Sequence, residues 1–460
     1  MTNPSDFPFM PSPYPLVDGL GPRFLTGTAA KRRLPSPAPG ARVEAGVAAL
    51  PPDPPTPAPS SSVNGQIQRM LLAISDEIAM SAPLWPVFQA IIIQMPNTAF
   101  VVLVEEEARQ IVSQWLTLQG PVVNGRVTLV DWQQNEDGDP PLTGWVQDPF
   151  IPAVYGGQRP PTQLLVPQGS DDPIPIQLAA DQALELERAV TPVAFEGGNL
   201  LFDAGRYCIG LDTIDQTQAL ITNGTIPPAP HGVGADGYIT NLYHRYVDGT
   251  RDPCRIGLPD VTYPAQQTRE IMVNGHPYDE TVYFGNLEGT HQPIFHIDMF
   301  ITLLGRDEAT DSPLVLLGSP IQAQDLMYDE VETPPEALAD GFDAIQTQLQ
   351  SYGYVVRRNP LPLMYLDFPP DEGNERGERR WFFASYNNCI VEVTETSKTV
   401  WMPTYGQGYG EWEPRLARVN DANEALFQEL GFTVIRMPDC TMLACDAGSI
   451  HCVVNYLQRG

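Results

Sequence analysis

The sequence predicts an α/β protein in which several similar αβ units pack round a common centre, behind a proline-rich tail. Two observations predict this fold class. Short apolar runs typical of buried strands alternate with segments that have helical spacing of apolar residues. One helix–glycine–strand pattern also occurs twice with the same order of residue types. A repeat of this kind indicates like units that bury their apolar faces against one another.

Residues 1–64 differ in composition from the rest of the chain. Prolines crowd 34–39 and 51–59, and three serines follow at 60–62. Because repeated prolines remove amide donors and favour extended polyproline II, we expect a flexible tail without a core. Such a tail is either an inert linker or a docking segment for a partner. Residues 65–460 are predicted to form one folded domain.

The folded part is expected to begin near Gln66. The next apolar residues recur at helical spacing and predict a helix with one buried face: Ile67, Met70, Leu71, Ile74 and Ile78. A strand–helix–strand unit follows, with strands at 99–104 and 126–131 around a helix at 105–116. Further strands are predicted at 200–202, 206–210, 380–386 and 389–393.

The repeated unit spans 338–360 in its first copy and 422–438 in its second. Both copies read helix, Gly, aromatic, any residue, Val, any residue, Arg, any residue, Pro. Glycine suits the end of a helix, and β-branched residues suit the strand that follows. The similarity has two interpretations. Either the chain contains a true internal repeat, or two ordinary helix–strand connections are alike by chance.

Acidic residues dominate the charge. The chain has 26 Lys and Arg against 56 Asp and Glu, which gives a formal net charge of −30 at pH 7. Such a surface repels nucleic acid and anionic membranes, so neither is an expected partner, and it attracts cationic ligands. A requirement for solubility explains the same composition without any ligand.

The six cysteines are expected to be reduced thiols in a cytoplasmic protein. The first residues show neither the basic region nor the continuous apolar stretch of a secretion signal. The cysteine spacings do not indicate a zinc site, and no apolar run reaches the length of a membrane span.

Two loop segments carry the first candidate site residues. Trp145-Val-Gln-Asp148 precedes a proline, which favours a loop, although an acid in a loop equally caps a helix or faces solvent. Glu196-Gly-Gly-Asn199 precedes the strand at 200–202. Its glycines allow positive φ between strands, and a simple β-turn is the alternative interpretation without a role in a site.

Two later segments add a histidine, a carboxylate and a cysteine. His296 and Asp298 lie in an apolar run that is predicted to be a strand. Since residues i and i+2 share one face of a strand, both side chains are expected to point the same way and to need polar partners. Cys452 follows a Gly/Ser turn near the end of the chain. In this order the four segments suggest a cysteine hydrolase whose site is gathered from distant loops.

These segments resemble, in colinear order, those of the guanidine-modifying deiminase superfamily, the penteins. Glu196-Gly-Gly-Asn199, followed by Leu-Leu-Phe, is similar to the Glu/Asp-Gly-Gly turn of agmatine deiminases and dimethylarginine hydrolases. Three more segments are similar to those of agmatine deiminases: Ala384-Ser-Tyr-Asn-Asn388, Trp401-Met-Pro-Thr-Tyr-Gly406 and Gly448-Ser-Ile-His-Cys452. Trp-x-Gln-Asp resembles protein-arginine deiminases instead, because agmatine deiminases usually have Trp-x-Arg-Asp. The resemblance covers about Trp145 to Asn455.

The resemblance implies a five-bladed αβ propeller with pseudo-fivefold symmetry. It also implies that Asp148 and Asp298 bind a planar guanidinium cation through paired, charge-assisted hydrogen bonds. Cys452 would attack the guanidinium carbon as a thiolate, and His296 would transfer protons before and after a covalent thiouronium intermediate. This chemistry requires neither a metal nor an organic cofactor.

Three other residues complete the site that the resemblance implies. Glu196 is expected to orient His296 or brace the site, and Trp145 and Asn199 are expected to contribute to substrate binding. Calcium dependence is not predicted, because Ile151 and Leu201 occupy the places of calcium-binding acids in vertebrate-type protein-arginine deiminases.

The motifs indicate two different substrate classes. Trp-x-Gln-Asp favours arginine within peptides or proteins, converted to citrulline, and this is the expected substrate. The other motifs favour a small guanidine, agmatine or free arginine, as the alternative. A catalytically inactive propeller that binds cationic partners is the alternative of a different class. The intact set of cysteine, histidine and two aspartates argues against it.

Overall fold

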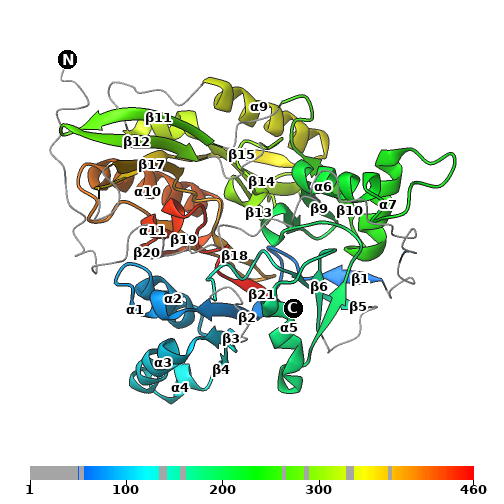
Figure 1. The fold of residues 1–460 in the computed structure, drawn as a ribbon, viewed down its shortest axis with the longest axis horizontal. Helices are drawn as coiled ribbons and strands as arrows, with labels where there is room; N and C mark the ends of the chain where they lie inside the picture. Colours follow the sequence, from blue (N-terminus) through cyan, green and yellow to red (C-terminus); the bar gives the residue numbers. More distant parts are fainter. Residues whose placement is uncertain are drawn as a thin grey trace.

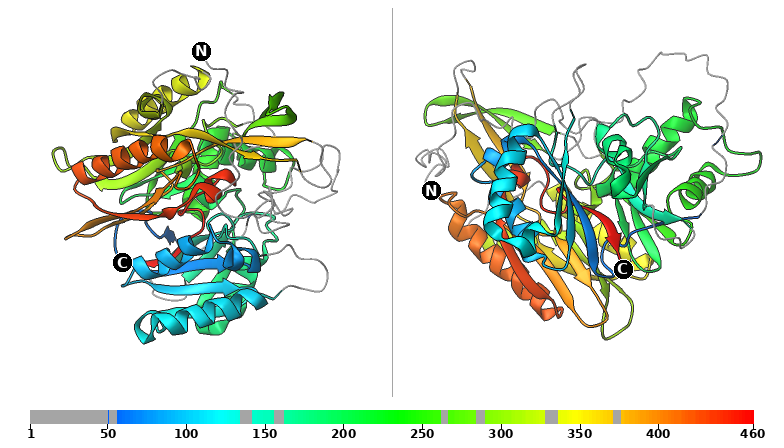
Figure 2. Two further views of the ribbon diagram at one scale, coloured as in Figure 1. Left: turned by 90° about the vertical axis from the view of Figure 1, so that its left-hand side faces the viewer. Right: turned by 90° about the horizontal axis from the view of Figure 1, so that it is seen from below.

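The protein has a mixed α/β fold made of several small sheets. It is described here from a computed structural model, which covers residues 50, 56–133, 142–155, 162–261, 266–283, 290–327, 336–370 and 376–460. Within these residues the strands form six sheets of three or four strands, and none of the sheets closes on itself. Most helices lie toward the outside of the molecule, and the hairpin at 266–283 and the short strand at 57–59 also reach its edge (Figure 1, Figure 2).

Five of the six sheets share one strand pattern within the described residues. In each, the first strand is antiparallel to the second, and the second is parallel to the third. Helices connect the two parallel strands, as such a crossover requires. Their three-strand cores are β5 (Ile151–Tyr155), β6 (Thr162–Val166), β7 (Leu186–Val190); β8 (Leu200–Phe202), β9 (Arg206–Gly210), β10 (Asp252–Ile256); β13 (Ile301–Arg306), β14 (Pro313–Ser319), β15 (Val355–Pro360); β18 (Ile390–Val393), β19 (Lys398–Thr404), β20 (Thr433–Asp439); and β21 (Asn455–Arg459), β2 (Ile67–Ile74), β3 (Ala99–Val104).

The remaining strands extend this set. Two add an edge to one of the five sheets: β1 (Pro57–Pro59) beside β5, and β4 (Val127–Asp131) beside β3. The sixth sheet has the order β11 (Gln266–Val273), β12 (His276–Tyr283), β17 (Gly377–Phe383), β16 (Leu363–Phe368). The helices are α1 (Asp76–Met80), α2 (Trp85–Gln94), α3 (Glu106–Gln119), α4 (Pro121–Asn124), α5 (Pro173–Ala180), α6 (Leu211–Thr222), α7 (Ala235–Tyr246), α8 (Pro320–Met327), α9 (Glu336–Ser351), α10 (Trp412–Glu429) and α11 (Thr441–Cys445).

The predicted first helix is wrong, because residues 67–74 form strand β2. This strand lies between β21 and β3, and its residues from Met70 to Ile74 are fully buried. A strand covered on both faces has apolar residues at almost every position, which also satisfies helical spacing. The helical part of the prediction is limited to α1, which contains the buried Ile78.

The predicted strand–helix–strand unit is confirmed as β3, α3 and β4, with β3 and β4 parallel. The repeat is confirmed as well. Its two copies are α9 with β15 and α10 with β20, each the crossover helix and third strand of one sheet. Gly353 and Gly431 end the two helices with φ of 86° and 83°, the left-handed conformation that favours glycine.

The end of the predicted tail belongs to the fold. We call residues 56–65 the N-terminal strap. Its β1 pairs with β5, the amide of Ser62 donates to the carbonyl of Phe202 at 2.8 Å, and the carbonyl of Val63 accepts from the amide of Val393 at 2.9 Å. The strap therefore joins three sheets, and the fold begins before residue 65. Residues 1–49 and 51–55 of the predicted tail lie outside the described residues.

The two ends of the described chain meet in one sheet. β21, near the C terminus, pairs with β2, near the start of the fold, and Figure 1 shows the red strand beside the blue one. Cys452 lies just before β21, so this pairing fixes the nucleophile segment to the first apolar strand of the domain.

Candidate active site

Cys452 lies in a buried turn between α11 and β21, and it is 1% exposed. Trp145 helps to shape this turn, because a Cβ on Gly448 would overlap the indole ring. The structure thus places Trp145 against the nucleophile turn, where its contact positions the segment that carries Cys452.

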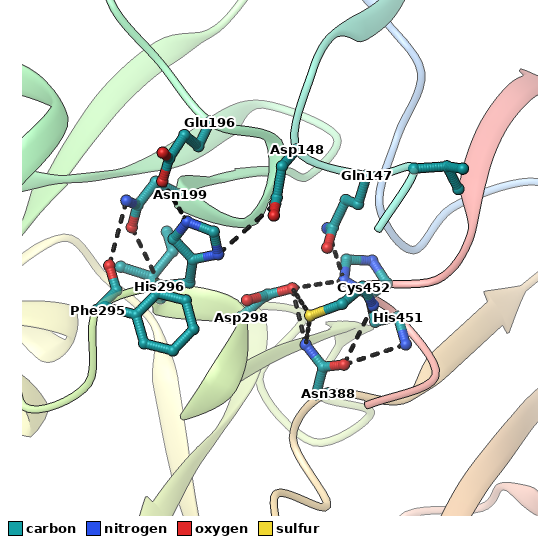
Figure 3. A network of polar contacts seen from close by, with 12 residues as sticks. Gln147, Asp148, Glu196, Asn199, Phe295, His296, Asp298, Asn388, His451 and Cys452 are labelled. Atoms are coloured by element: carbon teal, nitrogen blue, oxygen red, sulfur yellow. Dashed lines mark hydrogen bonds and ion pairs between the residues drawn. The ribbon is translucent and has the colours of Figure 1, made fainter. Parts of the chain in front are cut away.

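Asn388 connects Cys452 to Asp298 (Figure 3). Its Nδ2 donates to Asp298 Oδ2 at 2.8 Å and to Cys452 Sγ at 3.2 Å. Its Oδ1 accepts from the backbone amides of His451 at 3.1 Å and Cys452 at 3.2 Å. One amide side chain therefore orients the thiol, its backbone and the carboxylate together.

Asp298 is 1% exposed and lies at the centre of this network. The Cys452 thiol donates to its Oδ2 at 3.9 Å, and His451 Nδ1 lies 2.9 Å from the same oxygen. The other oxygen, Oδ1, is buried and has no hydrogen-bond partner among the described residues. Asp298 thus has one oxygen held by the protein and one buried oxygen without a hydrogen-bond partner among the described residues.

The predicted strand at His296 and Asp298 is wrong at this point. Residues Ile297–Met299 form a 3₁₀ turn, closed by a hydrogen bond from the Met299 amide to the His296 carbonyl, and β13 begins only at Ile301. The turn still directs both side chains into the site. A short apolar run before a strand has no feature that separates its turn from the strand itself.

His296 is fully buried and lies between two carboxylates. Its Nε2 is 2.6 Å from Glu196 Oε2, and its Nδ1 is 3.6 Å from Asp148 Oδ1. The side chains of Asp148 and Glu196 are 19% and 24% exposed. These contacts place a carboxylate at each ring nitrogen, and Glu196 lies within hydrogen-bond distance of the imidazole that it is predicted to orient.

The glycines of Glu196-Gly-Gly-Asn199 serve close packing and not a positive φ. Gly197–Asn199 form a 3₁₀ turn, and neither glycine has positive φ. A Cβ on Gly197 would overlap the carbonyl of Gln147, and a Cβ on Gly198 would overlap His296. Glycine is required at both positions because the Gln147 carbonyl lies against the backbone of Gly197 and the His296 ring lies against that of Gly198.

Asn199 acts within the protein. Its Oδ1 accepts from the amide of Ile297 at 3.2 Å and from Gln292 Nε2 at 3.0 Å, and its Nδ2 donates to the carbonyl of Phe295 at 3.3 Å. Both ends of the amide therefore fix the segment that carries His296, which is a positioning role; the predicted contact with substrate stays a prediction.

All the site residues occupy equivalent places in the repeated pattern. Asp148 precedes β5, Glu196 precedes β8, Asp298 precedes β13, Asn388 precedes β18 and Cys452 precedes β21. Each of the five similar sheets thus contributes its polar group just before its first strand. The structure brings all the predicted site segments to one place.

Sequence reasoning missed three residues of the network: Gln147, Asn388 and His451. All three lie within segments that carried the family resemblance. Asn388 and His451 each lie in a short mixed segment before an apolar strand, and no spacing in the sequence reveals which partner such a residue will meet.

The other five cysteines are buried free thiols. Burial raises the pKa of Cys389 to about 12 and that of Cys254 to about 11. It also raises the pKa values of Cys208, Cys440 and Cys445. A raised pKa makes these five thiols poor nucleophiles at neutral pH. Cys452, in contrast, contacts the side chains of Asn388 and Asp298.

A cavity of about 40 Å³ lies beside the site. Its lining includes Gln147, Gly197 and His451 from the site and Ser60 and Ser62 from the N-terminal strap. The cavity has the volume of a few water molecules. The strap therefore forms one wall of a space that the site residues line.

The described residues contain neither a metal-binding cluster nor a helix that could span a membrane. Within them, no group of three or more His, Cys, Asp or Glu side chains is arranged to hold a metal ion. In the same part of the chain, no helix combines the length and the apolar character that crossing a bilayer requires.

The fold and the network define a multi-sheet α/β protein with a buried cysteine–carboxylate–histidine site. No family model and no curated protein matches the chain. Solved structures of agmatine deiminases do match. The enzyme of C. jejuni has a TM-score of 0.50 at 13% identity, over 88% of this chain and 96% of that chain. The enzyme of Enterococcus faecalis has a TM-score of 0.52 at 12% identity, over 87% and 95%. The chain thus shares the fold of these agmatine deiminases, and the resemblance is confirmed at the level of the fold.

Proposed function

We propose that the protein is a hydrolase that deiminates a guanidinium group, with Cys452 as the nucleophile. One observation carries the proposal. Cys452 with Asp298, and His296 with Asp148 and Glu196, come from distant segments and lie at one place (Figure 3). A nucleophile, a proton carrier and carboxylates for a cation are the parts that this reaction needs.

The carboxylates of the site suit a planar cation. Asp298 has one buried oxygen without a hydrogen-bond partner among the described residues, and Asp148 lies across the site near His296. Carboxylates match the donor fork of a guanidinium with paired, charge-assisted hydrogen bonds. Asp148 and Asp298 are therefore the proposed substrate clamps, and the acidity of the whole chain attracts the same charge.

The proposed reaction has two steps. The Cys452 thiolate forms a bond to the guanidinium carbon, and the resulting tetrahedral adduct expels ammonia after His296 donates a proton. Water activated by His296 then attacks the thiouronium carbon, and the carbon–sulfur bond breaks. Guanidinium and water thus become a ureido group and ammonium. Glu196, 2.6 Å from His296, would hold the ring while its charge changes.

A small guanidine is the favoured substrate class, with agmatine or free arginine as its members. Support comes from the similarity of the fold to two agmatine deiminases and from the Ser-Tyr-Asn-Asn388 and Ile-His-Cys452 segments. Trp-x-Gln-Asp148 supports the expected peptidyl arginine. The comparisons thus favour the alternative over the protein-arginine substrate that the sequence led us to expect.

We also propose that the five similar sheets surround the site as the blades of a propeller. The support is positional, since each sheet contributes a site residue just before its first strand. A pseudo-fivefold arrangement brings such equivalent positions to one centre.

A substrate panel tests the proposed function. The full chain is incubated with agmatine, free arginine and an arginine peptide, with and without calcium, and ureido product and ammonia are measured. We expect equal amounts of both products from a small guanidine. Turnover of the peptide alone would restore the protein-arginine assignment. No turnover of any of them by the folded protein would refute a deiminase, and calorimetry with the same compounds would then test cation binding.

A further inference from the structure

His451 lies next to the nucleophile in sequence and makes two side-chain contacts with one ring nitrogen. Its Nδ1 is 2.9 Å from Asp298 Oδ2 and 2.8 Å from Gln147 Nε2. The ring is buried, and its backbone amide is fixed by Asn388. The mechanism above uses His296 for proton transfer and leaves His451 without a role.

The two contacts determine where the proton of His451 lies. An ionised Asp298 accepts hydrogen bonds and cannot donate, so Nδ1 must carry the proton to bond to Oδ2. Gln147 Nε2 is also a donor, whereas Gln147 Oε1 is buried without a hydrogen-bond partner among the described residues. Exchanging the amide oxygen and nitrogen of Gln147, which have nearly the same shape, lets the oxygen accept from Nδ1 and moves the nitrogen to the buried position without a hydrogen-bond partner among the described residues. Nδ1–H then donates to two oxygens, Asp298 Oδ2 and Gln147 Oε1.

We propose that His451 is a positioning residue for Asp298, with its proton held on Nδ1 by Asp298 and Gln147. Two donors, Asn388 Nδ2 at 2.8 Å and His451 Nδ1 at 2.9 Å, fix Oδ2. Oδ1 is left for the guanidinium. This role rests on the proposed function for the identity of the cation, while the tautomer of His451 can be measured without any substrate.

A matched pair of variants tests the role. Asn and Leu have nearly the same shape, but only His451→Asn keeps a donor near the position of Nδ1. We expect His451→Leu to lower kcat/KM for the best guanidine about 10- to 100-fold, chiefly through KM, because the carboxylate that binds the cation loses a charge-assisted hydrogen bond. His451→Asn should stay within about fivefold of wild type. Thermal unfolding of both variants checks that the fold is retained.

The activities of the two His451 variants, compared with each other, distinguish a positioning role from proton transfer and from no role. If His451→Asn is as impaired as His451→Leu, the ring itself transfers protons, and the positioning role is overturned. Activity of both variants at the wild-type level would overturn it too. Rescue by Asn alone is the result that supports it, since a purely structural role would not depend on the donor.

The tautomer is measured on the substrate-free protein by ¹⁵N-detected NMR of the histidine side chains. The chain has 6 histidines, and His451→Asn identifies the signals that belong to His451. We expect a protonated Nδ1. A bare Nδ1 with the proton on Nε2, in an enzyme that turns over a guanidine, would overturn the positioning role alone. A protein without turnover on any guanidine would overturn the proposed function, and the positioning role in that reaction with it.

Discussion

Gly198→Ala tests whether His296 must occupy its observed position. A Cβ at residue 198 would lie 2.9 Å from His296 Cγ and closer still to Nδ1, and it would lie 3.0 Å from Asp298 Oδ1. Ordinary contact begins near 3.4 Å, so Cγ must retreat by at least the difference between 3.4 and 2.9 Å, and Nδ1 by more. The ring therefore moves by roughly 1 Å, a displacement that can lower the rate of a reaction about 100-fold.

The expected outcome is a folded enzyme with kcat reduced about 100-fold. Overpacking of this kind costs about 1–3 kcal/mol of stability, which urea unfolding would measure. Gly205→Ala is the matched control, because nothing lies within 4 Å of its Cβ position and its φ is not positive. The control should retain wild-type activity. A Gly198→Ala enzyme with wild-type kcat would refute the conclusion that the imidazole acts from this position.

Three further predictions concern the nucleophile, the strap and a buried acid. Cys452→Ala should lower turnover at least about 1,000-fold and leave guanidine binding measurable by calorimetry; retained turnover would remove Cys452 from its role. Deleting residues 1–49 should leave kcat and Tm unchanged. Deleting residues 1–64 removes β1 and the buried Val63 and should lower the free energy of unfolding by at least about 2 kcal/mol. Equal Tm values for the two deletion variants would contradict the role of the strap. Burial raises the pKa of Asp439 to about 6. Folding therefore takes up a proton between about pH 4 and 6, and the free energy of unfolding falls by about 2 kcal/mol as pH rises through that window. Asp439→Asn should abolish this pH dependence, as measured by urea unfolding.

Local patterns predicted the elements well where one face is exposed or a helix ends at a glycine. α3, α9 and α10 have apolar residues on one face, and Gly353 and Gly431 mark where two of them end. The prediction failed at β2, where neighbouring strands lie on both sides and every residue from Met70 to Ile74 is apolar and fully buried. Periodicity carries no information in such a segment, and only the pairing with β21 and β3 decides its structure.

The site could be predicted in its ionisable groups but not in its contacts. Asp148, His296, Asp298 and Cys452 have residue types that belong to the chemistry, and the structure brings them together. Asn388 and Asn199 are amides that hold backbone and side chains from other segments. Their partners are far away in sequence, so the hydrogen bonds exist only after the sheets have packed. The same is true of Gly198, whose requirement comes from His296 and not from its own φ.

Gln147 shows how a contact changes the meaning of a motif. Trp-x-Gln-Asp, in place of the usual Trp-x-Arg-Asp of agmatine deiminases, was the reason to expect a protein-arginine substrate. In the structure Gln147 faces His451 at 2.8 Å, on the side of Asp298 that Asn388 and His451 already hold. An arginine at this position would place a permanent cation beside His451 and Asp298. A neutral glutamine instead leaves the charge of Asp298 to the substrate. The contact of Gln147 with His451 therefore gives the motif a role in holding Asp298, and this role does not depend on what the guanidinium is attached to.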